Sequence, residues 1–268
     1  MPSISTRIGD VSYSTHGSGP PIILLHAILH TNHDFDAIIP HLSLHYQVIA
    51  IDWPWHGESS HPANQQPTAV LFADVLEDIV AALKLPPAIL IGNSVGGFAA
   101  ARLAITHPDK VAGLVLVNTG GFVPWDWVKS LFGRLLGIPL VARWIMPFLV
   151  WRYMVPQNAE DKAIATQVAA AAKTVEGSKV LASVWASFLR PSYDLRSQAS
   201  EIKAPTLIIW GKKDPVVPLS VGQFTHKTIK GSRFETLNTG HVVFASKPDE
   251  FIALVEPFIR ETLGAKLK

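Results

Sequence analysis

Gly92, Ser94 and Gly96 have the types and the spacing that can expose a nucleophilic serine. They stand between an apolar run at 88–91 and an alanine-rich stretch at 95–106, which predict a strand and a helix. A serine on a sharp strand-to-helix turn needs small residues two positions to either side, because larger side chains would collide there. The start of the helix would also present free backbone N–H groups to developing negative charge. The alternative is a glycine-rich turn with an incidental serine, and the flanking strand and helix favour the nucleophile.

A serine hydroxyl needs a base to become a nucleophile, and the base needs a carboxylate that orients it. Asp214 follows the apolar run 207–210, and His241 follows the run 233–237. Parallel strands bring their carboxyl ends to one edge of a sheet, so both residues would share that edge with Ser94. Alone, Asp214 would be assigned to a turn and His241 to an exposed loop. Together, in the chain order Ser, Asp, His, they predict a catalytic triad.

The elements that must position these side chains alternate between strand and helix patterns. Nearly continuous apolar runs, typical of strands buried on both faces of a parallel sheet, stand at 22–25, 48–51, 88–91, 114–117 and 207–210. Helical spacing of apolar residues occurs at 68–83, 95–106 and 249–263. Residues 3–8 and 11–15 predict an antiparallel hairpin that turns at Gly9-Asp10. This alternation predicts an α/β fold with right-handed crossovers.

The alternation stops between residues 121 and 190, where no convincing strand occurs and the chain is rich in tryptophan. We expect a helical cap at 121–190, inserted into a core formed by 1–120 and 191–268. The candidates for an apolar substrate pocket are Trp125, Trp144, Phe148, Trp151 and Val242. Packing of cap helix against cap helix is the alternative use of the aromatic rings in the cap.

Composition bounds the classes of function that fit the chain. With 268 residues, 48% of them hydrophobic and 16% charged, the chain can form one large domain with a sizeable core. A formal charge of +2 and short basic runs argue against nucleic-acid binding. The absence of cysteine excludes disulfides and thiolate metal sites and fits a cytoplasmic location. Arginines and prolines interrupt the most hydrophobic region, 131–154, so we expect no stable membrane insertion, and interfacial attraction to lipid stays open.

With these motifs the chain resembles the α/β-hydrolase superfamily over nearly its whole length. The further motifs that carry the resemblance are Leu25-His26-Ala27, the run from Asp52 to Ser59, Gly211-Lys212-Lys213-Asp214 and Gly240-His241. The resemblance implies a mostly parallel, eight-stranded α/β-hydrolase sheet flanked by helices, with 121–190 as the helical cap. It implies no cofactor. The remaining histidines are too scattered, without supporting carboxylates, to predict a metal site.

The resemblance also assigns roles to single residues. It implies that Ser94 is the nucleophile, His241 the general base and acid, and Asp214 the orienting carboxylate. The backbone N–H groups of Ile28 and Val95 would form the oxyanion hole. Some members take their carboxylate from the end of the preceding strand. This chain has Asn118 there, so Asp214 keeps the role.

Two positions depart from the family pattern near the expected oxyanion loop. Ala27 stands where the family usually has glycine, and Trp55 stands inside the usual Pro-Gly-His-Gly motif. Trp55 would either cover its own loop or narrow the pocket. His26, beside the oxyanion loop, is expected to shape that loop through hydrogen bonds to backbone groups.

Three functions fit these residues. The first is a serine hydrolase that cleaves a small or medium hydrophobic ester through an acyl-enzyme intermediate. The second is a C–C bond hydrolase of ring-fission diketones, which the chain resembles around Ser94, although Val95 and Val242 stand where that group typically has methionine and tryptophan. A cap arginine would bind the diketone carboxylate, and Arg190 is the candidate. The third is a catalytically slow relative that binds a small ligand. In each case the expected partner is a small hydrophobic molecule, and the oligomeric state stays open.

Overall fold

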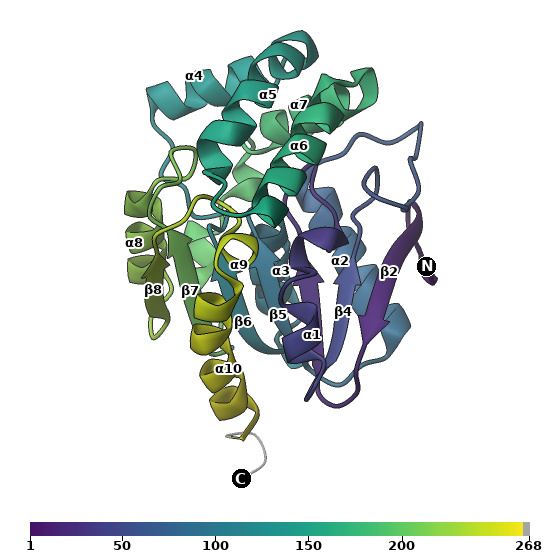
Figure 1. Ribbon diagram of the computed structural model, residues 1–268, viewed down its shortest axis with the longest axis vertical. Helices are drawn as coiled ribbons and strands as arrows, with labels where there is room; N and C mark the ends of the chain where they lie inside the picture. The colour runs from purple at the N-terminus through teal and green to yellow at the C-terminus, as the bar shows by residue number, and fades with distance from the viewer. Residues whose placement is uncertain (265–268) are drawn as a thin grey trace.

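The computed structural model describes residues 1–264, and its central layer is an eight-stranded sheet (Figure 1). The strands are β1 (Ser3–Thr6), β2 (Gly9–His16), β3 (Pro21–Leu25), β4 (Gln47–Ile51), β5 (Ala88–Asn93), β6 (Val111–Val117), β7 (Thr206–Gly211) and β8 (Arg233–Leu237). Their order across the sheet is β1-β2-β4-β3-β5-β6-β7-β8. β2 runs antiparallel to both of its neighbours, and the strands from β4 to β8 in this order are parallel. The predicted mostly parallel, eight-stranded sheet is confirmed.

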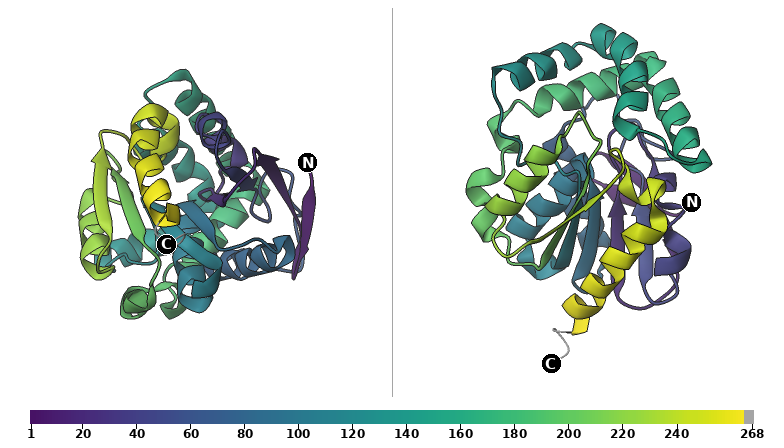
Figure 2. Two further views of the ribbon diagram at one scale, coloured as in Figure 1. Left: turned by 90° about the horizontal axis from the view of Figure 1, so that it is seen from below. Right: turned by 60° about the vertical axis from the view of Figure 1, so that its left-hand side comes forward.

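The middle strands are buried on both faces, which explains their continuous apolar runs. Every residue of β3, β5, β6 and β7 is buried. Helices α2 (Ala69–Leu83) and α3 (Val95–Thr106) cover one face, and α1 (Ile39–Leu42) and α10 (Pro248–Gly264) cover the other (Figure 2). A parallel sheet requires such cover because both of its faces are apolar.

The smaller helices complete the edges of the sheet. Helix α8 (Leu219–Thr228) packs on β7 and β8, and α9 (Val243–Ser246) packs on β7 and α10. Short 3-10 helices stand at Asn32–Phe35, Pro108–Lys110, Pro191–Tyr193 and Arg196–Glu201. The three helices predicted from apolar spacing form within one residue of the expected bounds. Thr68 begins α2, because its hydroxyl accepts a hydrogen bond from the Leu71 N–H (3.1 Å).

The hairpin at the amino end differs from the predicted one. The structure pairs Thr6 with Gly9, so Arg7 and Ile8 form the turn, and the expected turn at Gly9-Asp10 is wrong. Gly9 has a φ of 136°, which glycine adopts readily, and it closes the turn rather than forming its centre. The Thr6 hydroxyl donates to the Gly9 carbonyl oxygen (2.6 Å), and Arg7 Nε donates to Asp78 (2.8 Å). These bonds hold the turn two residues earlier than predicted.

Helices α4 (Trp127–Leu136), α5 (Pro139–Met154), α6 (Ala159–Lys173) and α7 (Val175–Ser187) stand between β6 and β7 in the chain. We call these helices the helical layer. It lies over the carboxyl ends of the parallel strands, at the top of the molecule in Figure 1. Side chains cap three of its helices: Asp126 accepts from the Lys129 N–H, Asn158 from the Asp161 N–H, and Thr174 from the Gly177 N–H.

Within residues 1–264, no single helix is long and apolar enough to cross a membrane. Helices α4 and α5 together have the required length and composition, but they bend by 106° where they meet.

The turn from β5 into α3 depends on glycines that let two backbones approach closely. A Cβ on Gly96 would lie 2.3 Å from the carbonyl oxygen of Leu25 in β3. A Cβ on Gly92 would lie 2.5 Å from the carbonyl oxygen of Gly96. Neither obstacle is a flexible side chain that could move aside. The helix can therefore start directly against the sheet only when these positions have no side chain.

The substitution Gly96→Ala should lower the free energy of unfolding by about 3 kcal/mol, because the added methyl group forces α3 away from β3. Urea unfolding followed by tryptophan fluorescence measures this loss. Gly264→Ala is the matched control, since a Cβ at Gly264 meets no atom within 4 Å. Equal stability of the two variants would contradict the close packing described here.

Candidate active site

Ser94 occupies a strained turn between β5 and α3. Its backbone has φ 55° and ψ −115°, outside the regions that residues with a side chain normally adopt. Such strain costs about 1–3 kcal/mol and persists only where the surroundings hold it. Here the Ser94 N–H donates to the Val117 carbonyl oxygen (3.1 Å), and the Ser94 carbonyl oxygen accepts from the Gly120 N–H (3.0 Å). Neighbouring backbone thus holds the serine at the carboxyl end of the sheet.

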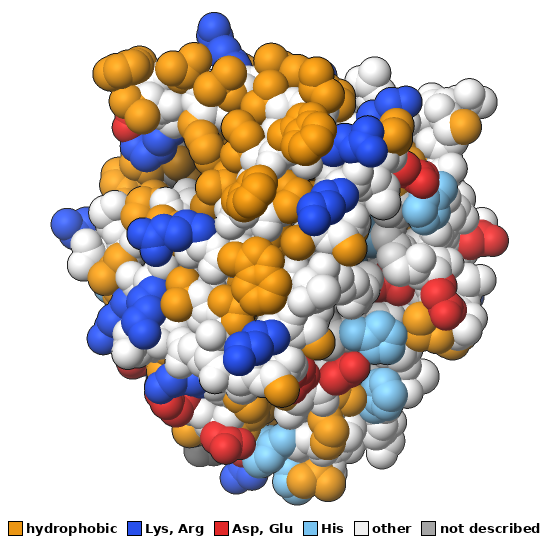
Figure 3. Space-filling view, turned by 45° about the horizontal axis from the view of Figure 1, so that its top comes forward, with side chains coloured by type: hydrophobic (Ala, Val, Ile, Leu, Met, Phe, Trp, Pro, Cys, Tyr) orange, Lys and Arg blue, Asp and Glu red, His pale blue; other side chains and the backbone are white. Residues whose placement is uncertain are grey.

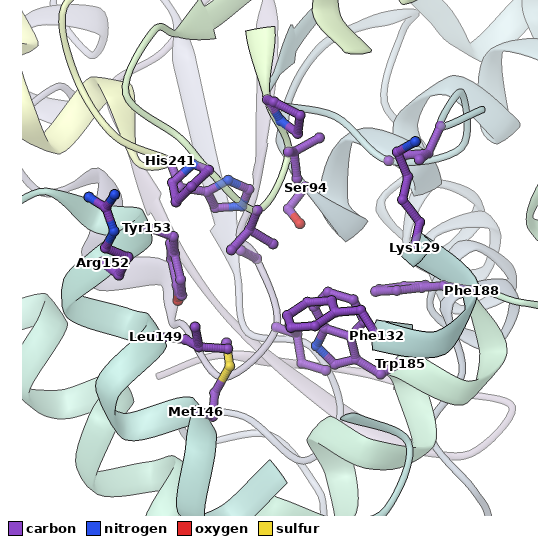
Figure 4. Close-up of a pocket in the computed structure, with 18 of the residues that line it drawn as sticks. Ser94, Lys129, Phe132, Met146, Leu149, Arg152, Tyr153, Trp185, Phe188 and His241 are labelled. Atoms are coloured by element: carbon purple, nitrogen blue, oxygen red, sulfur yellow. The ribbon is translucent and has the colours of Figure 1, made fainter. Parts of the chain in front are cut away.

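Asp214 and His241 form a buried hydrogen-bonded pair, although 27 residues separate them in the chain. His241 Nδ1 donates to Asp214 Oδ2 at 2.5 Å, and the two residues are only 5% and 3% exposed. Because Nδ1 carries the proton of this bond, the Nε2 lone pair of a neutral His241 is free to accept one. Ser94 and His241 line the same cavity (Figure 4), so the structure pairs the predicted histidine with the predicted aspartate and places the predicted serine on the same cavity wall as the histidine.

Further hydrogen bonds fix the Asp214 carboxylate. Its Oδ1 accepts from the backbone N–H groups of Val216 (2.9 Å) and Val217 (3.0 Å). Its Oδ2 accepts from Asn118 Nδ2 (2.7 Å), and Asn118 Oδ1 accepts from the Gly211 N–H (2.9 Å). The asparagine at the end of β6 therefore orients the carboxylate that follows β7. The sequence offered one signal for this role, a polar residue directly after an apolar run.

The backbone of His241 is held from two distant segments. Its N–H donates to the Tyr153 carbonyl oxygen at the end of α5 (3.0 Å), and its carbonyl oxygen accepts from Asn93 Nδ2 (3.1 Å). A Cβ on Gly240 would lie 2.0 Å from the Met154 carbonyl oxygen, so only glycine permits α5 to approach this closely. The position of the histidine thus depends on the helical layer as well as on the sheet. Sequence reasoning missed Asn93 and Tyr153.

Tyr153 also belongs to a buried polar cluster beside the cavity. Its ring meets the His241 ring edge-on, with centroids 5.3 Å apart. Its hydroxyl lies 3.1 Å from His30 Nε2, and His30 Nδ1 donates to Asp34 Oδ2 (2.6 Å). Since that nitrogen carries the proton, Nε2 of a neutral His30 accepts from the tyrosine hydroxyl. Burial raises the pKa of Tyr153 well above its usual value, so the hydroxyl stays protonated.

Two buried histidines shape the loop after β3, where Ile28 was predicted to help form the oxyanion hole. His26 Nδ1 donates to the Ala27 carbonyl oxygen (2.6 Å), and its Nε2 accepts from the Trp53 N–H (3.0 Å). His56 Nδ1 donates to the Pro54 carbonyl oxygen (2.8 Å), and its Nε2 accepts from the Leu29 N–H (2.9 Å). The expected backbone bonds of His26 are present. Both rings are neutral in these bonds, since each uses one nitrogen as an acceptor.

Burial lowers the pKa of both histidines, because the interior disfavours their charged forms. The pKa of His26 falls well below its usual value, and that of His56 falls to about 4. Within the loop after β3, Ala27 and Ile28 line the cavity together with Ser94. Val95 is fully buried at the start of α3. Of the two residues expected to supply backbone donors, Ile28 thus lies on the cavity wall and Val95 directly follows Ser94.

The two departures from the family pattern have structural explanations. Ala27 does not have a positive φ; Leu29 takes the left-handed conformation in this loop, with φ 64°. Trp55 has φ 67° at a position where the family uses glycine. Its indole Nε1 donates to the Pro62 carbonyl oxygen (3.3 Å), its ring packs against Phe72, and it does not line the cavity. Trp55 covers its own loop.

The cavity above Ser94 has a volume of about 460 Å³ and lies between the sheet and the helical layer. Apolar and aromatic side chains form most of its wall, among them Phe132, Met146, Leu149, Trp185 and Phe188 (Figure 4). Lys129, Arg152 and the Tyr153 ring also reach it. A wall of this kind suits a ligand that is largely apolar and carries few polar groups.

The predicted pocket residues are only partly placed at this cavity. Trp125 lines the cavity, but Val242 is fully buried and does not line it. Trp144, Phe148 and Trp151 lie on the outer surface, 70%, 77% and 45% exposed, which corrects the expectation that they line the pocket. The reason is the helical period of α5, in which residues 144, 148 and 151 share one side while 146, 149 and 153 share the other.

Comparisons with known proteins agree with this architecture. The family model for the alpha/beta hydrolase fold matches residues 20–248. A pimeloyl-[acyl-carrier protein] methyl ester esterase of Neisseria meningitidis is 29% identical over 253 residues, covering 90% of this chain and 77% of that protein. Among solved structures, a thermophilic esterase from Thermogutta terrifontis superposes with a TM-score of 0.80 at 22% identity, over 97% of this chain and 98% of that one. A meta-cleavage product hydrolase from Pseudomonas fluorescens gives 0.74 at 23%, with coverage of 97% and 98%.

The buried neutral His56 should make stability depend on pH. Its pKa is about 4 in the folded protein against 6.5 for an ordinary histidine, so the unfolded chain binds a proton first as the pH falls. Between pH 6.5 and 4 the wild type should lose about 3 kcal/mol more free energy of unfolding than His56→Gln, whose amide oxygen can still accept from Leu29. Urea unfolding at several pH values measures this difference. His45 is exposed, so His45→Gln is the control. If the free energy of unfolding depends on pH in the same way in both variants, His56 is not the buried neutral histidine described here.

Proposed function

The chain belongs to the alpha/beta hydrolase family, and we propose that within it the chain is a serine hydrolase that cleaves a small or medium hydrophobic ester. The observation that carries the proposal is the buried Asp214–His241 pair, beside a largely apolar cavity that Ser94 also lines. The esterases among the similar proteins agree with this reaction. In this proposal the helical layer is a cap that closes the cavity from above.

The proposed reaction proceeds through an acyl-enzyme. Ser94 Oγ attacks the carbonyl carbon of the ester while His241 Nε2 takes the hydroxyl proton. The negative charge on the carbonyl oxygen is stabilised by the backbone N–H groups of Ile28 and Val95. As the tetrahedral intermediate collapses, the bond to the alcohol breaks and His241 returns its proton to the leaving oxygen. A water molecule then attacks the acyl-enzyme by the same route and releases the acid.

Asp214 has an electrostatic role in this scheme. Its Oδ2 holds the proton on His241 Nδ1, which directs the Nε2 lone pair to the serine. When His241 becomes positively charged, the carboxylate stabilises that charge in a buried site, where the attraction is weakly screened. The bonds from Asn118, Val216 and Val217 hold the carboxylate in place.

The wall of the cavity also supports a second candidate, the hydrolysis of a C–C bond in a ring-fission diketone. Such a substrate carries a carboxylate, and Lys129 and Arg152 line the cavity as cations that could bind it. Arg190, which the sequence suggested for this role, lies instead in a separate hollow with Arg134 and Arg196. The same serine and histidine would perform both reactions, so substrate turnover must distinguish them.

Ser94→Ala should reduce the hydrolysis of p-nitrophenyl butyrate by about 10⁴-fold or more, because the nucleophile is lost while the fold is kept. Initial rates measure the loss, and circular dichroism checks the fold. Ser130→Ala removes a hydroxyl from the neighbouring hollow and should retain full activity. Undiminished turnover in Ser94→Ala would discard the mechanism, and a wild type that turns over no ester would favour a relative that only binds a ligand.

Acyl chain length should matter strongly, because each added methylene is buried in an apolar cavity. We expect kcat/KM to rise about fourfold per methylene from acetate to hexanoate esters. Leu149→Trp, which narrows the cavity, should shift the optimum to shorter chains, whereas Phe148→Trp on the outer side of α5 should not. A panel of p-nitrophenyl esters beside one ring-fission diketone measures this. A diketone that is cleaved faster than every ester would replace the ester proposal with the second candidate.

A further inference from the structure

The outer side of helices α4 and α5 exposes an unusual amount of apolar surface. Six large side chains of these two helices that do not line the cavity are 45% to 78% exposed. They define the outer face: Trp127, Leu131, Leu140, Trp144, Phe148 and Trp151. Figure 3 shows hydrophobic side chains gathered over this end of the molecule, with lysine and arginine side chains among them. Apolar patches of this kind mark surfaces that bind a partner or a lipid layer.

This exposure is confined to one region. Among the described residues 1–264, the strongly exposed large apolar side chains outside 127–151 are Met1, Leu44 and Val175. Helix α5 is apolar on both sides, since Met146 and Val150 are buried beneath it while Trp144 and Phe148 face outward. A helix that is apolar all round is normally covered on every side. The outer face therefore has the composition of a covered surface.

The charged residues of the segment that carries the outer face are almost all positive. Residues 125–155 contain Lys129, Arg134, Arg143 and Arg152, with Asp126 as their single acidic residue. Asp126 pairs with Lys129, and within residues 1–264 the structure gives none of these arginines an acidic partner. Tryptophan and phenylalanine beside arginine and lysine suit a negatively charged lipid surface, where rings enter the interface and cations meet phosphate groups.

We propose that the outer face docks the protein on the surface of an anionic lipid bilayer. Helices α4 and α5 lie against the headgroup region without crossing the bilayer. Charge complementarity favours an anionic lipid surface over a second copy of the chain as the partner of the outer face. A two-fold dimer would bring two copies of the same positively charged segment together, with one acidic residue per copy to compensate.

The docked face and the cavity share the same helices. Phe132 on α4 and Leu149 on α5 line the cavity, while Leu131 and Phe148, their neighbours in the chain, belong to the outer face. A docked molecule therefore holds the cavity of Ser94 close to the lipid surface. The docking itself does not rest on the proposed hydrolase activity, because adsorption needs no reaction.

Flotation with phospholipid vesicles tests the apolar part of the proposal. The wild type should float with phosphatidylcholine vesicles that contain about 30% phosphatidylglycerol, and more weakly with phosphatidylcholine alone. Trp144→Ser/Phe148→Ser should weaken the partition coefficient at least about tenfold, since it removes two interfacial rings. Leu44 is an equally exposed apolar residue outside the outer face, so Leu44→Ser should float like the wild type.

A second pair of variants tests the charge. Arg134→Gln/Arg143→Gln should weaken binding to the anionic vesicles about tenfold, and added salt should weaken the binding of the wild type. Lys227→Gln/Lys230→Gln removes two exposed cations elsewhere and should bind like the wild type. Ser94→Ala should float like the wild type, so that a failure of the hydrolase proposal is distinguished from a failure of docking.

Wild-type protein that stays unbound at all vesicle concentrations would overturn the proposal. Binding that neither double variant weakens would overturn it as well, because the surface responsible would lie elsewhere. Light scattering after size exclusion adds a third decisive outcome. A dimer that Trp144→Ser/Phe148→Ser dissociates, without vesicle binding, would identify the outer face as a contact between two copies.

Discussion

The hydrogen bond between Asp214 and His241 is the contact on which the arrangement of the whole site depends. It joins the ends of β7 and β8, and other elements hold both residues in place. Asn118 at the end of β6 donates to the carboxylate, Asn93 at the end of β5 donates to the histidine carbonyl, and Tyr153 in α5 accepts its N–H. A displacement of any of these strands or of α5 would disturb the pair. The Asp214 carboxylate can be buried because each hydrogen bond that it accepts comes from a donor held in place by the surrounding structure.

Much of the fold could be predicted from the sequence, because the parallel strands are buried on both faces and give uninterrupted apolar runs. The hairpin turn was misplaced because Gly9 suggested the centre of a turn, whereas its pairing with Thr6 puts the turn two residues earlier. The helices of 121–190 could not be bounded in the same way. Helix α5 is apolar all round and contains Pro147, so neither its period nor its ends stand out in the sequence.

The candidate site was predictable as far as the placement of Ser94, Asp214 and His241 after strands; the structure pairs Asp214 with His241 and places Ser94 and His241 on one cavity wall. The part that Tyr153 plays was not predictable, because its carbonyl oxygen accepts the bond from His241 and every residue type has a carbonyl oxygen. The pocket shows a related limit. On a helix with rings on both sides, sequence gives the period but not which side faces the cavity, so Trp144, Phe148 and Trp151 were assigned to the pocket although they lie outside it.

The central claim is that the turn of Ser94 and the Asp214–His241 pair together activate one serine. The most direct measurement is reaction of the protein with a fluorophosphonate, which forms a stable bond only with an activated serine, followed by peptide mass spectrometry. The account predicts one adduct per chain, on the peptide that contains Ser94, and a rate of labelling that collapses in His241→Gln. Labelling of a different residue, or an unchanged rate in His241→Gln, would contradict it.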